Sequence, residues 1–285
     1  ASRASTTPSH SLMLGADANR AILSRLNTSA RSTPAGFVWS TGACEAAKND
    51  SNMLPPPSSC TDSSWDGQVW NLLLTGTPRA GTTLFSRLMT KLGLPFSNDN
   101  TAPTPHGMAA WRLAHCVEHR GLRHHLHNRP AQIYGRFRHV LHQVRDPLSG
   151  VASLLTEAPY WRHQQGELRQ ACPALNFSQP DSHLALQIWV HWNAHLDAQP
   201  FVPRAHRVES LPEVLPRLLR AVGYAEEDIP STPTIARHIK TLDDQNLFNR
   251  RKHRQPYSWR ELTRIDAQLA LKAERMATQY GYIYR

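Results

Sequence analysis

The stretch from residue 69 to residue 83 reads VWNLLLTGTPRAGTT. Residues 69–74 form a short apolar run, which is typical of a strand buried on both faces of a parallel sheet. Residues 82–92 carry apolar side chains along one helical face, and Gly93 follows as a helix end. Between the two segments lies a turn with two glycines, Gly76 and Gly81. A strand, a glycine-containing turn and a helix in this order predict the phosphate-binding unit of an α/β protein.

Predicted strands and helices continue to alternate after this unit. A second strand is predicted for 137–144 and a brief one for 207–209, while residues 95–107 hold three prolines and are predicted to form a loop. Further helices are predicted for 108–127, 148–156, 181–198, 211–222 and 259–280. This alternation predicts a three-layer α/β fold with a central parallel sheet.

The first part of the chain has a different composition. Residues 1–65 are rich in Ser, Thr, Pro, Ala and Asn and show no sustained hydrophobic period, so we expect an irregular stem or wrapping arm ahead of a domain at 66–285. No run of about 20 apolar residues, the length that crosses a bilayer, occurs. Because the chain begins at Ala1 rather than Met, membrane attachment is expected only through an upstream anchor.

The net charge points to an anionic partner. The chain has 285 residues, is 40% hydrophobic and carries 32 Lys and Arg against 22 Asp and Glu, a formal charge of +10. That hydrophobic content is enough for a full core, which excludes a disordered or fibrous protein. The excess of basic residues favours a cofactor, acceptor or polymer that is negatively charged.

Cysteines and glycosylation sequences favour the secretory pathway. The four cysteines are an even number that permits two disulfides in three pairings, and none has the CxxC spacing of a zinc site: Cys44, Cys60, Cys116 and Cys172. Three Asn-x-Ser/Thr sequences could accept glycans: Asn27, Asn49 and Asn176. Together they favour a disulfide-containing glycoprotein of a secretory lumen, most readily the Golgi, with a cytoplasmic location as the alternative.

The predicted phosphate loop departs from the nucleotide-hydrolase pattern at one position. Residues 76–83 match G-x4-G-K-[ST], except that Thr82 stands where the phosphate-binding lysine belongs. Without that lysine, ATP or GTP hydrolysis lacks its main cation for the β- and γ-phosphates. A cation appears inside the loop instead, as Arg79.

The loop GTPRAGTTL resembles the 5′-phosphosulfate loop of sulfotransferases that use 3′-phosphoadenosine 5′-phosphosulfate (PAPS). The resemblance is strongest to the membrane-associated tyrosylprotein and carbohydrate enzymes. It implies that Arg79 contacts the bridging oxygen and the transferring sulfuryl group, and that no metal takes part. The other cofactor-binding residues implied by the loop are Pro78, Ala80, Gly81, Thr82 and Thr83.

A second motif, RDPLSGVAS, follows the strand predicted for 137–144. It resembles the family's 3′-phosphate motif, in which an arginine and a serine eight residues later bind one phosphate, here Arg145 and Ser153. A guanidinium fork and a hydroxyl form a chemically sensible clamp for such a group. The basic run at 250–254 resembles the loop that closes over the 3′-phosphate, with Arg251 and Lys252 as its implied contacts. In the related segment RVESL, Glu209 is expected to anchor the fold rather than take part in the chemistry.

The acceptor and the catalytic base are less defined. Direct in-line transfer needs a base near the acceptor, and His106, at the start of the helix predicted for 108–127, is the first candidate. Three further candidates are His115, Glu118 and His142. Tyrosylprotein enzymes carry Glu at the position of His106. The acceptor therefore stays open among a carbohydrate, a protein tyrosine and a small metabolite, and its reacting group can be a hydroxyl or an amine. The alternative functions are a P-loop phosphotransferase and a noncatalytic heparin- or nucleic-acid-binding protein, although no nucleic-acid partner is expected.

Overall fold

The computed structural model describes residues 69–99, 103–111, 121–125, 132–172, 174–198, 205–244 and 255–284, with 121–125, 132–136, 167, 170, 171 and 244 described by their backbone alone. All of these residues belong to one compact unit of the chain. The arm predicted for 1–65 and its boundary lie outside the described residues. So do several residues singled out in the sequence: Arg251, Lys252, His115, Glu118, Cys44, Cys60, Cys116, Asn27 and Asn49.

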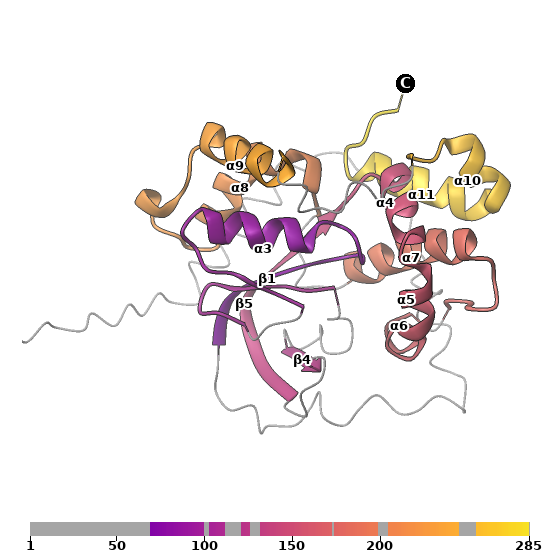
Figure 1. Ribbon diagram of the computed structural model, residues 1–285, viewed down its shortest axis with the longest axis horizontal. Helices are drawn as coiled ribbons and strands as arrows, with labels where there is room; N and C mark the ends of the chain where they lie inside the picture. The colour runs from indigo at the N-terminus through magenta and orange to yellow at the C-terminus, as the bar shows by residue number, and fades with distance from the viewer. Residues whose placement is uncertain are drawn as a thin grey trace, which may run out of the picture. The chain divides into compact units, whose positions relative to one another are not determined.

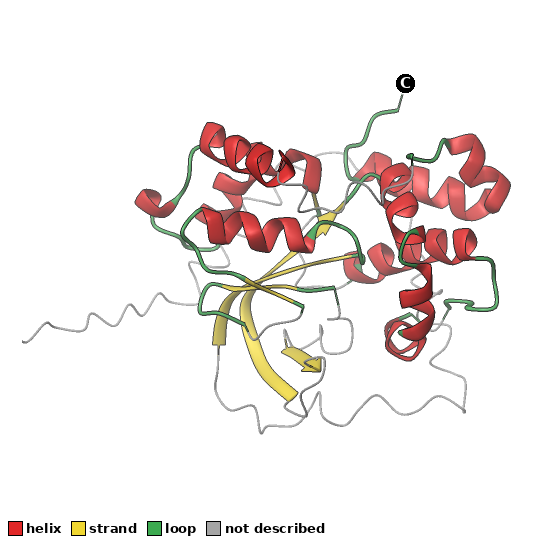
Figure 2. Cartoon of the chain, in the orientation of Figure 1, coloured by secondary structure: helices red, strands yellow, loops and turns green. Residues whose placement is uncertain are grey.

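The centre of this unit is a sheet whose main part is parallel (Figures 1 and 2). In the described residues, five parallel strands run in the order β2 (Ser97–Asn98), β3 (Gly107–Ala109), β1 (Val69–Gly76), β5 (Gln132–Val144) and β6 (His206–Arg207). Strand β4 (Gly121–His125) pairs antiparallel with the first residues of β5, and β6 pairs with its last. The predicted α/β fold with a parallel sheet is confirmed. As expected for a central strand, Leu72, Leu73 and Leu74 of β1 are buried.

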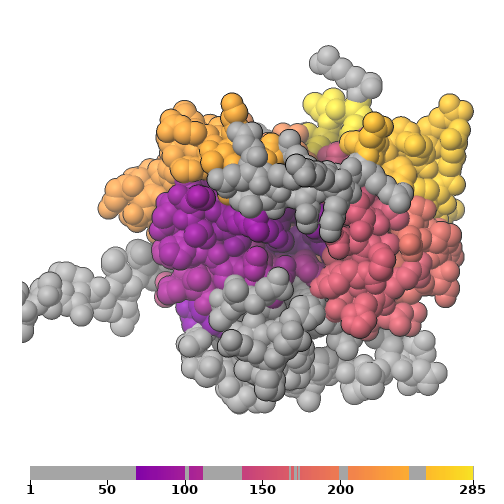
Figure 3. All heavy atoms as spheres, viewed as in Figure 1, coloured from indigo at the N-terminus to yellow at the C-terminus, as the bar shows by residue number. Residues whose placement is uncertain are grey.

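Helices cover both faces of the sheet. On one face, α3 (Thr82–Lys91), α8 (Leu211–Ala221) and α9 (Thr232–Asp244) share a core with Leu72, Leu74 and Leu141. The space-filling view shows the orange side chains of α9 against the indigo and magenta ones of α3 (Figure 3). Val144 lies an odd number of residues from Leu141 on β5, so its side chain faces the opposite side.

On that opposite side, Val144 packs with the second and larger core. Buried tryptophans such as Trp189 and Trp192 fill much of it. The helices that contribute to this core are α4 (Pro147–Leu155), α5 (Ala158–His163), α6 (Gln165–Ala171), α7 (Asp181–Asp197), α10 (Trp259–Ile265) and α11 (Ala267–Gln279).

Two helix predictions are wrong. The helix predicted for 108–127 is not present in the described parts of that range, where Gly107–Ala109 forms β3 and Gly121–His125 forms β4. Pairing of β3 with β1 outweighs local preference there. The helix predicted for 259–280 is two helices, because the backbone of Asp266 is extended and its side chain caps α11 by accepting the Leu269 N–H at 2.9 Å.

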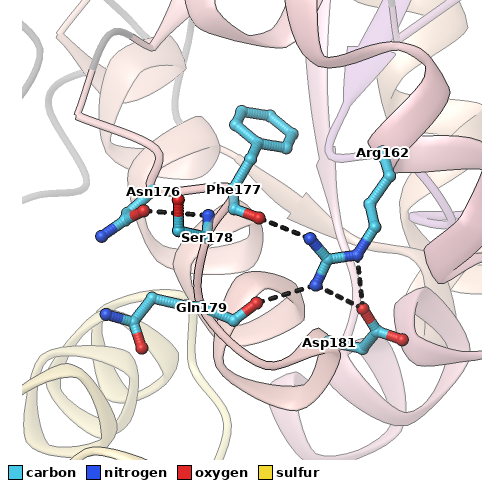
Figure 4. A network of polar contacts seen from close by, with 6 residues as sticks. All are labelled: Arg162, Asn176, Phe177, Ser178, Gln179 and Asp181. Carbon is cyan, nitrogen blue, oxygen red and sulfur yellow. Dashed lines mark hydrogen bonds and ion pairs between the residues drawn. The ribbon is translucent and has the colours of Figure 1, made fainter.

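The loop before α7 is held by one arginine (Figure 4). Arg162 of α5 donates to Asp181 at 2.7 Å, to the carbonyl oxygen of Gln179 at 2.7 Å and to the carbonyl oxygen of Phe177. The Phe177 ring is buried, whereas its neighbours Asn176 and Ser178 are exposed. This clamp therefore holds the loop in a conformation that leaves the side chains of Asn176 and Ser178 at the surface.

The remaining described cysteine, Cys172, is buried at the end of α6, with its Sγ 3.5 Å from the carbonyl oxygen of His191. Because its three possible partners lie outside the described residues, the disulfide pairing stays a prediction.

Candidate active site

The loop between β1 and α3 presents the amino end of a helix. Gly81 begins α3 in the left-handed conformation, with φ 98°, and its carbonyl oxygen accepts the Phe85 N–H at 3.0 Å. A tight turn precedes it, closed by the Ala80 N–H and the Thr77 carbonyl oxygen at 2.9 Å. No side chain caps this helix and its first turn has no acidic residue. The first amides and the positive end of the helix dipole can therefore serve an anion.

Close packing requires glycine at both ends of the loop. A Cβ on Gly76 would lie 2.2 Å from the carbonyl oxygen of Gln143 on β5. A Cβ on Gly81 would lie 2.8 Å from Cγ2 of Val208, in a backbone conformation that disfavours side chains. The loop therefore curls with its backbone against β5 and the turn after β6.

Arg79 lies at the strained point of this loop. Its φ is 69°, and among the described residues it is the one non-glycine residue with a positive φ. A left-handed conformation at such a residue costs on the order of 1 kcal/mol and is concentrated at functional sites. In this conformation, the Arg79 side chain extends out of the loop toward helix α4.

The structure brings the two sequence motifs together. The Arg79 Nε donates to the hydroxyl oxygen of Ser153 at 3.2 Å. From the end of β5, Arg145 Nη1 lies 3.5 Å from the carbonyl oxygen of Arg79. The intervening Gln143 holds the loop itself, donating from Nε2 to the Ala80 carbonyl oxygen at 2.8 Å. Arg79, Arg145 and Ser153, which are distant in the sequence, therefore form one cluster.

Arg145 is a half-buried cation with another cation beside it. Burial lowers its pKa, Glu209 opposes that shift, and the neighbouring charge of Arg79 lowers it further. An arginine stays protonated under such shifts, because its unperturbed pKa is above 12. Two guanidinium groups held this close, one of them desolvated, favour binding of an anion between or beside them.

Glu209 has the anchoring place expected of it. Its Oε1 accepts the backbone N–H of Asp146 at 3.1 Å, and its Oε2 accepts the hydroxyl of Tyr282 at 2.6 Å. These bonds join the turn after β6 to the start of α4 and to the C-terminal residues.

His106 does not lie at the phosphate loop. It precedes β3, whose Gly107 pairs with Leu72, so it is level with the early part of β1. At about 3.3 Å per residue, roughly 16 Å of strand separates that level from Gly76. Instead, its Nδ1 lies 3.2 Å from the hydroxyl of Tyr224, and the two rings stack. The prediction of His106 as catalytic base depended on a helix that begins at this point. The structure has strand β3 there, and the carboxyl end of this strand, not its start, lies at the edge of the sheet that carries the loop.

The reserve candidate His142 is buried within the fold. Its Nδ1 lies 3.1 Å from Asp197 Oδ1 and its Nε2 lies 3.1 Å from Asn193 Oδ1, so α7 occupies both ring nitrogens. This arrangement joins β5 to α7 and gives the imidazole no path to an acceptor.

One carboxylate at the correct edge of the sheet was missed by sequence reasoning. Asp99 directly follows β2, and its Oδ1 accepts the N–H of Trp111 at 3.0 Å, just beyond β3. In a parallel sheet the carboxyl ends of neighbouring strands share one edge, and Gly76 ends β1 there. The two-residue strand β2 is too short for a pattern to reveal, so the sequence indicated only a loop at 95–107.

No three His, Cys, Asp or Glu side chains within the described part of the chain are grouped as metal ligands.

Comparison with known proteins finds no match to a family model, to a curated protein or to a solved structure. The function of this site is therefore inferred from its own residues.

Proposed function

We propose that the chain is a sulfotransferase that moves the sulfuryl group of PAPS to a hydroxyl or amine acceptor by direct in-line transfer. The observation that carries this proposal is the contact of Arg79 with Ser153, which sets an anion-binding loop beside a second arginine and a hydroxyl. PAPS has a phosphosulfate at the 5′ position and a phosphate at the 3′ position of one ribose. A protein that binds both groups needs two cationic subsites separated by one ribose.

The residues of the loop fit the 5′ end. Gly76 and Gly81 let the loop pack closely against its neighbours, because a Cβ would lie within 3 Å of Gln143 or Val208. The amides that open α3 and the Thr82 and Thr83 hydroxyls would hold the 5′-phosphate. Arg79 would stabilise the negative charge that grows on the bridging oxygen as the bond from sulfur to that oxygen breaks.

Arg145, just before α4, and Ser153, on α4, fit the 3′ end. Arg145 supplies a guanidinium and Ser153 a hydroxyl, and the two lie on either side of Arg79 in the hydrogen-bond network. The acceptor loses a proton as its oxygen or nitrogen bonds to sulfur. The bond from sulfur to the bridging oxygen breaks, and the product 3′-phosphoadenosine 5′-phosphate (PAP) leaves. In place of His106, we assign the role of proton acceptor to Asp99, a described carboxylate at the edge of the sheet that carries the loop.

The proposal predicts a preference for nucleotides with a 3′-phosphate. PAP is expected to raise the melting temperature far more than ATP or heparin at equal concentration, because Arg145 and Ser153 bind a group that ATP lacks. Differential scanning fluorimetry with the three ligands measures this. A larger shift with ATP would favour a phosphotransferase, and a shift with heparin alone would favour a noncatalytic binder.

The proposed enzyme would work in the lumen of the secretory pathway, most readily the Golgi. Among the described helices, none is both long enough and apolar enough to cross a membrane. Support comes from the sequence Asn176-Phe177-Ser178, where both polar side chains are exposed and the ring between them is buried. The Asn176 Oδ1 accepts the Ser178 N–H at 3.0 Å, a bond that does not use the Nδ2 atom to which a glycan is attached (Figure 4).

We therefore expect Asn176 to carry an N-linked glycan when the chain is secreted from a eukaryotic host behind an added signal sequence. Peptide mass spectrometry after peptide-N-glycosidase F in heavy-oxygen water should find aspartate at position 176. Asn176→Gln and Ser178→Ala should each abolish that signal, whereas Ser178→Thr should keep it. An unmodified Asn176 in a secreted and folded chain would contradict the expectation.

A further inference from the structure

The C-terminal residues 280–284 carry three tyrosines at alternate positions, and we name this segment the tyrosine strap. Each tyrosine hydroxyl donates to a carboxylate: Tyr280 to Asp197 at 2.5 Å, Tyr282 to Glu209 at 2.6 Å and Tyr284 to Asp146 at 2.5 Å. Ile283, between the last two, is exposed. The strap thus presents its hydroxyls to the protein and its intervening side chain to solvent.

Two of these carboxylates flank Arg145. Asp146 is its neighbour in the chain, and the charges of both Glu209 and Asp146 act on its guanidinium and oppose the loss of its proton. A carboxylate that flanks an arginine ordinarily pairs with it. An arginine paired in this way is less available to a phosphate, because the carboxylate repels the ligand and occupies the N–H donors.

Each of the four oxygens of these two carboxylates accepts a hydrogen bond from a neutral donor. Glu209 accepts the Asp146 N–H on Oε1 and the Tyr282 hydroxyl on Oε2. Asp146 accepts the Tyr284 hydroxyl on Oδ1 and the Ser149 N–H on Oδ2 at 2.9 Å. The two carboxylates that flank Arg145 are therefore held by neutral groups. The guanidinium of Arg145 lies near them but forms no hydrogen bond with them in this network.

The strap is itself fixed in place. Arg207 donates to the Gly281 carbonyl oxygen at 2.7 Å and lies over the Tyr282 ring, and Tyr284 packs edge-on against Trp259. Burial, followed by the adjacent carboxylates, raises the pKa of both Tyr282 and Tyr284. Their hydroxyls consequently stay protonated and continue to donate throughout the ordinary pH range.

We propose that Tyr282 and Tyr284 are positioning residues that keep Glu209 and Asp146 from pairing with Arg145, and that they thereby set the preference for nucleotides with a 3′-phosphate. This inference rests on the proposed function, since it concerns the ligand of Arg145. Among the described hydrogen bonds, the strap makes none to the loop at 76–83, so we expect it to affect the 3′ end of the nucleotide and leave the 5′ subsite unchanged.

The test compares binding of PAP and of 5′-AMP, which differ only in the 3′-phosphate, by isothermal titration calorimetry. Tyr282→Phe keeps the ring and removes the hydroxyl, which releases Glu209 Oε2 to pair with Arg145. We expect PAP affinity to fall about fivefold, the order of one exposed ion pair, with AMP affinity unchanged. Adding Glu209→Gln to Tyr282→Phe should restore PAP affinity, because the released group no longer carries a charge.

Tyr280→Phe is the matched control. It removes the same kind of hydrogen bond, but from Asp197 on α7, and so should leave the ratio of PAP to AMP affinity at the wild-type value. An equal loss of PAP and AMP binding in Tyr282→Phe, or no recovery with Glu209→Gln, would show a merely structural strap and overturn the inference. A wild-type chain with no preference for PAP over AMP would overturn the proposed function, and the role of the strap with it.

Discussion

Replacing Arg79 with alanine is expected to lower the rate of sulfuryl transfer at saturating PAPS by about 100-fold or more. Such an effect is typical of losing one preorganised donor aimed at charge that develops in the transition state. Arg79 extends from a strained position of the loop and reaches Ser153, so its guanidinium spans the region between the two proposed phosphate subsites. PAP affinity should fall much less, because the loop amides, Arg145 and Ser153 remain.

Single-turnover rates at saturating PAPS, together with calorimetric PAP affinities, separate catalysis from binding. Arg79→Lys should recover part of the rate, since it keeps the charge and loses the planar fork. Arg237→Ala, on the exposed surface of α9, removes an equal charge without removing any described hydrogen bond of the loop, and should change neither quantity. Normal turnover at saturation in Arg79→Ala, with weaker PAP binding, would reduce Arg79 to a phosphate tether.

Gly76→Ala is expected to destabilise the fold by about 3 kcal/mol or more, at the upper end of the cost of overpacking a core. The added Cβ would lie 2.2 Å from a backbone oxygen of β5 and 3.0 Å from the Ala80 side chain, so β1 or the loop must move. Either movement also displaces the amides that open α3. We therefore expect a lower free energy of unfolding in urea and weaker PAP binding in the chain that remains folded.

Gly166→Ala provides the comparison for this effect. Gly166 lies in helix α6 with no atom within 4 Å of an added Cβ, and alanine is the better helix former by about 1 kcal/mol. That variant should be as stable as wild type or slightly more stable. Wild-type stability in Gly76→Ala would contradict the close packing of the loop on β5.

The parts of the site that follow directly from local sequence were predicted. The strand at 69–76, the loop after it and α3 have short-range signals, namely an apolar run, two glycines and one apolar helical face. Arg145 and Ser153 were predicted from a motif that follows a strand, and the structure places both beside Arg79. In these elements the local pattern and the tertiary contacts agree.

The parts that depend on strand register were not predicted. Gly107 lies against the backbone of Leu72 with φ 133°, an approach that only the pairing of β3 with β1 reveals. His106 was consequently assigned to the wrong edge of the sheet, and Asp99 was overlooked. The strap could not be foreseen either, because its alternate tyrosines acquire a role only through carboxylates supplied by α4 and by the turn after β6.

The central claim is that one nucleotide bridges the phosphate loop and the subsite formed by Arg145 and Ser153. A crystal structure of the chain with PAP tests this most directly. It should place the 5′-phosphate on the amides at the beginning of α3 and the 3′-phosphate within hydrogen-bond distance of the Arg145 guanidinium and the Ser153 hydroxyl. A PAP molecule whose 3′-phosphate lies away from Arg145 and Ser153, or a 5′-phosphate that does not contact the loop, would contradict it.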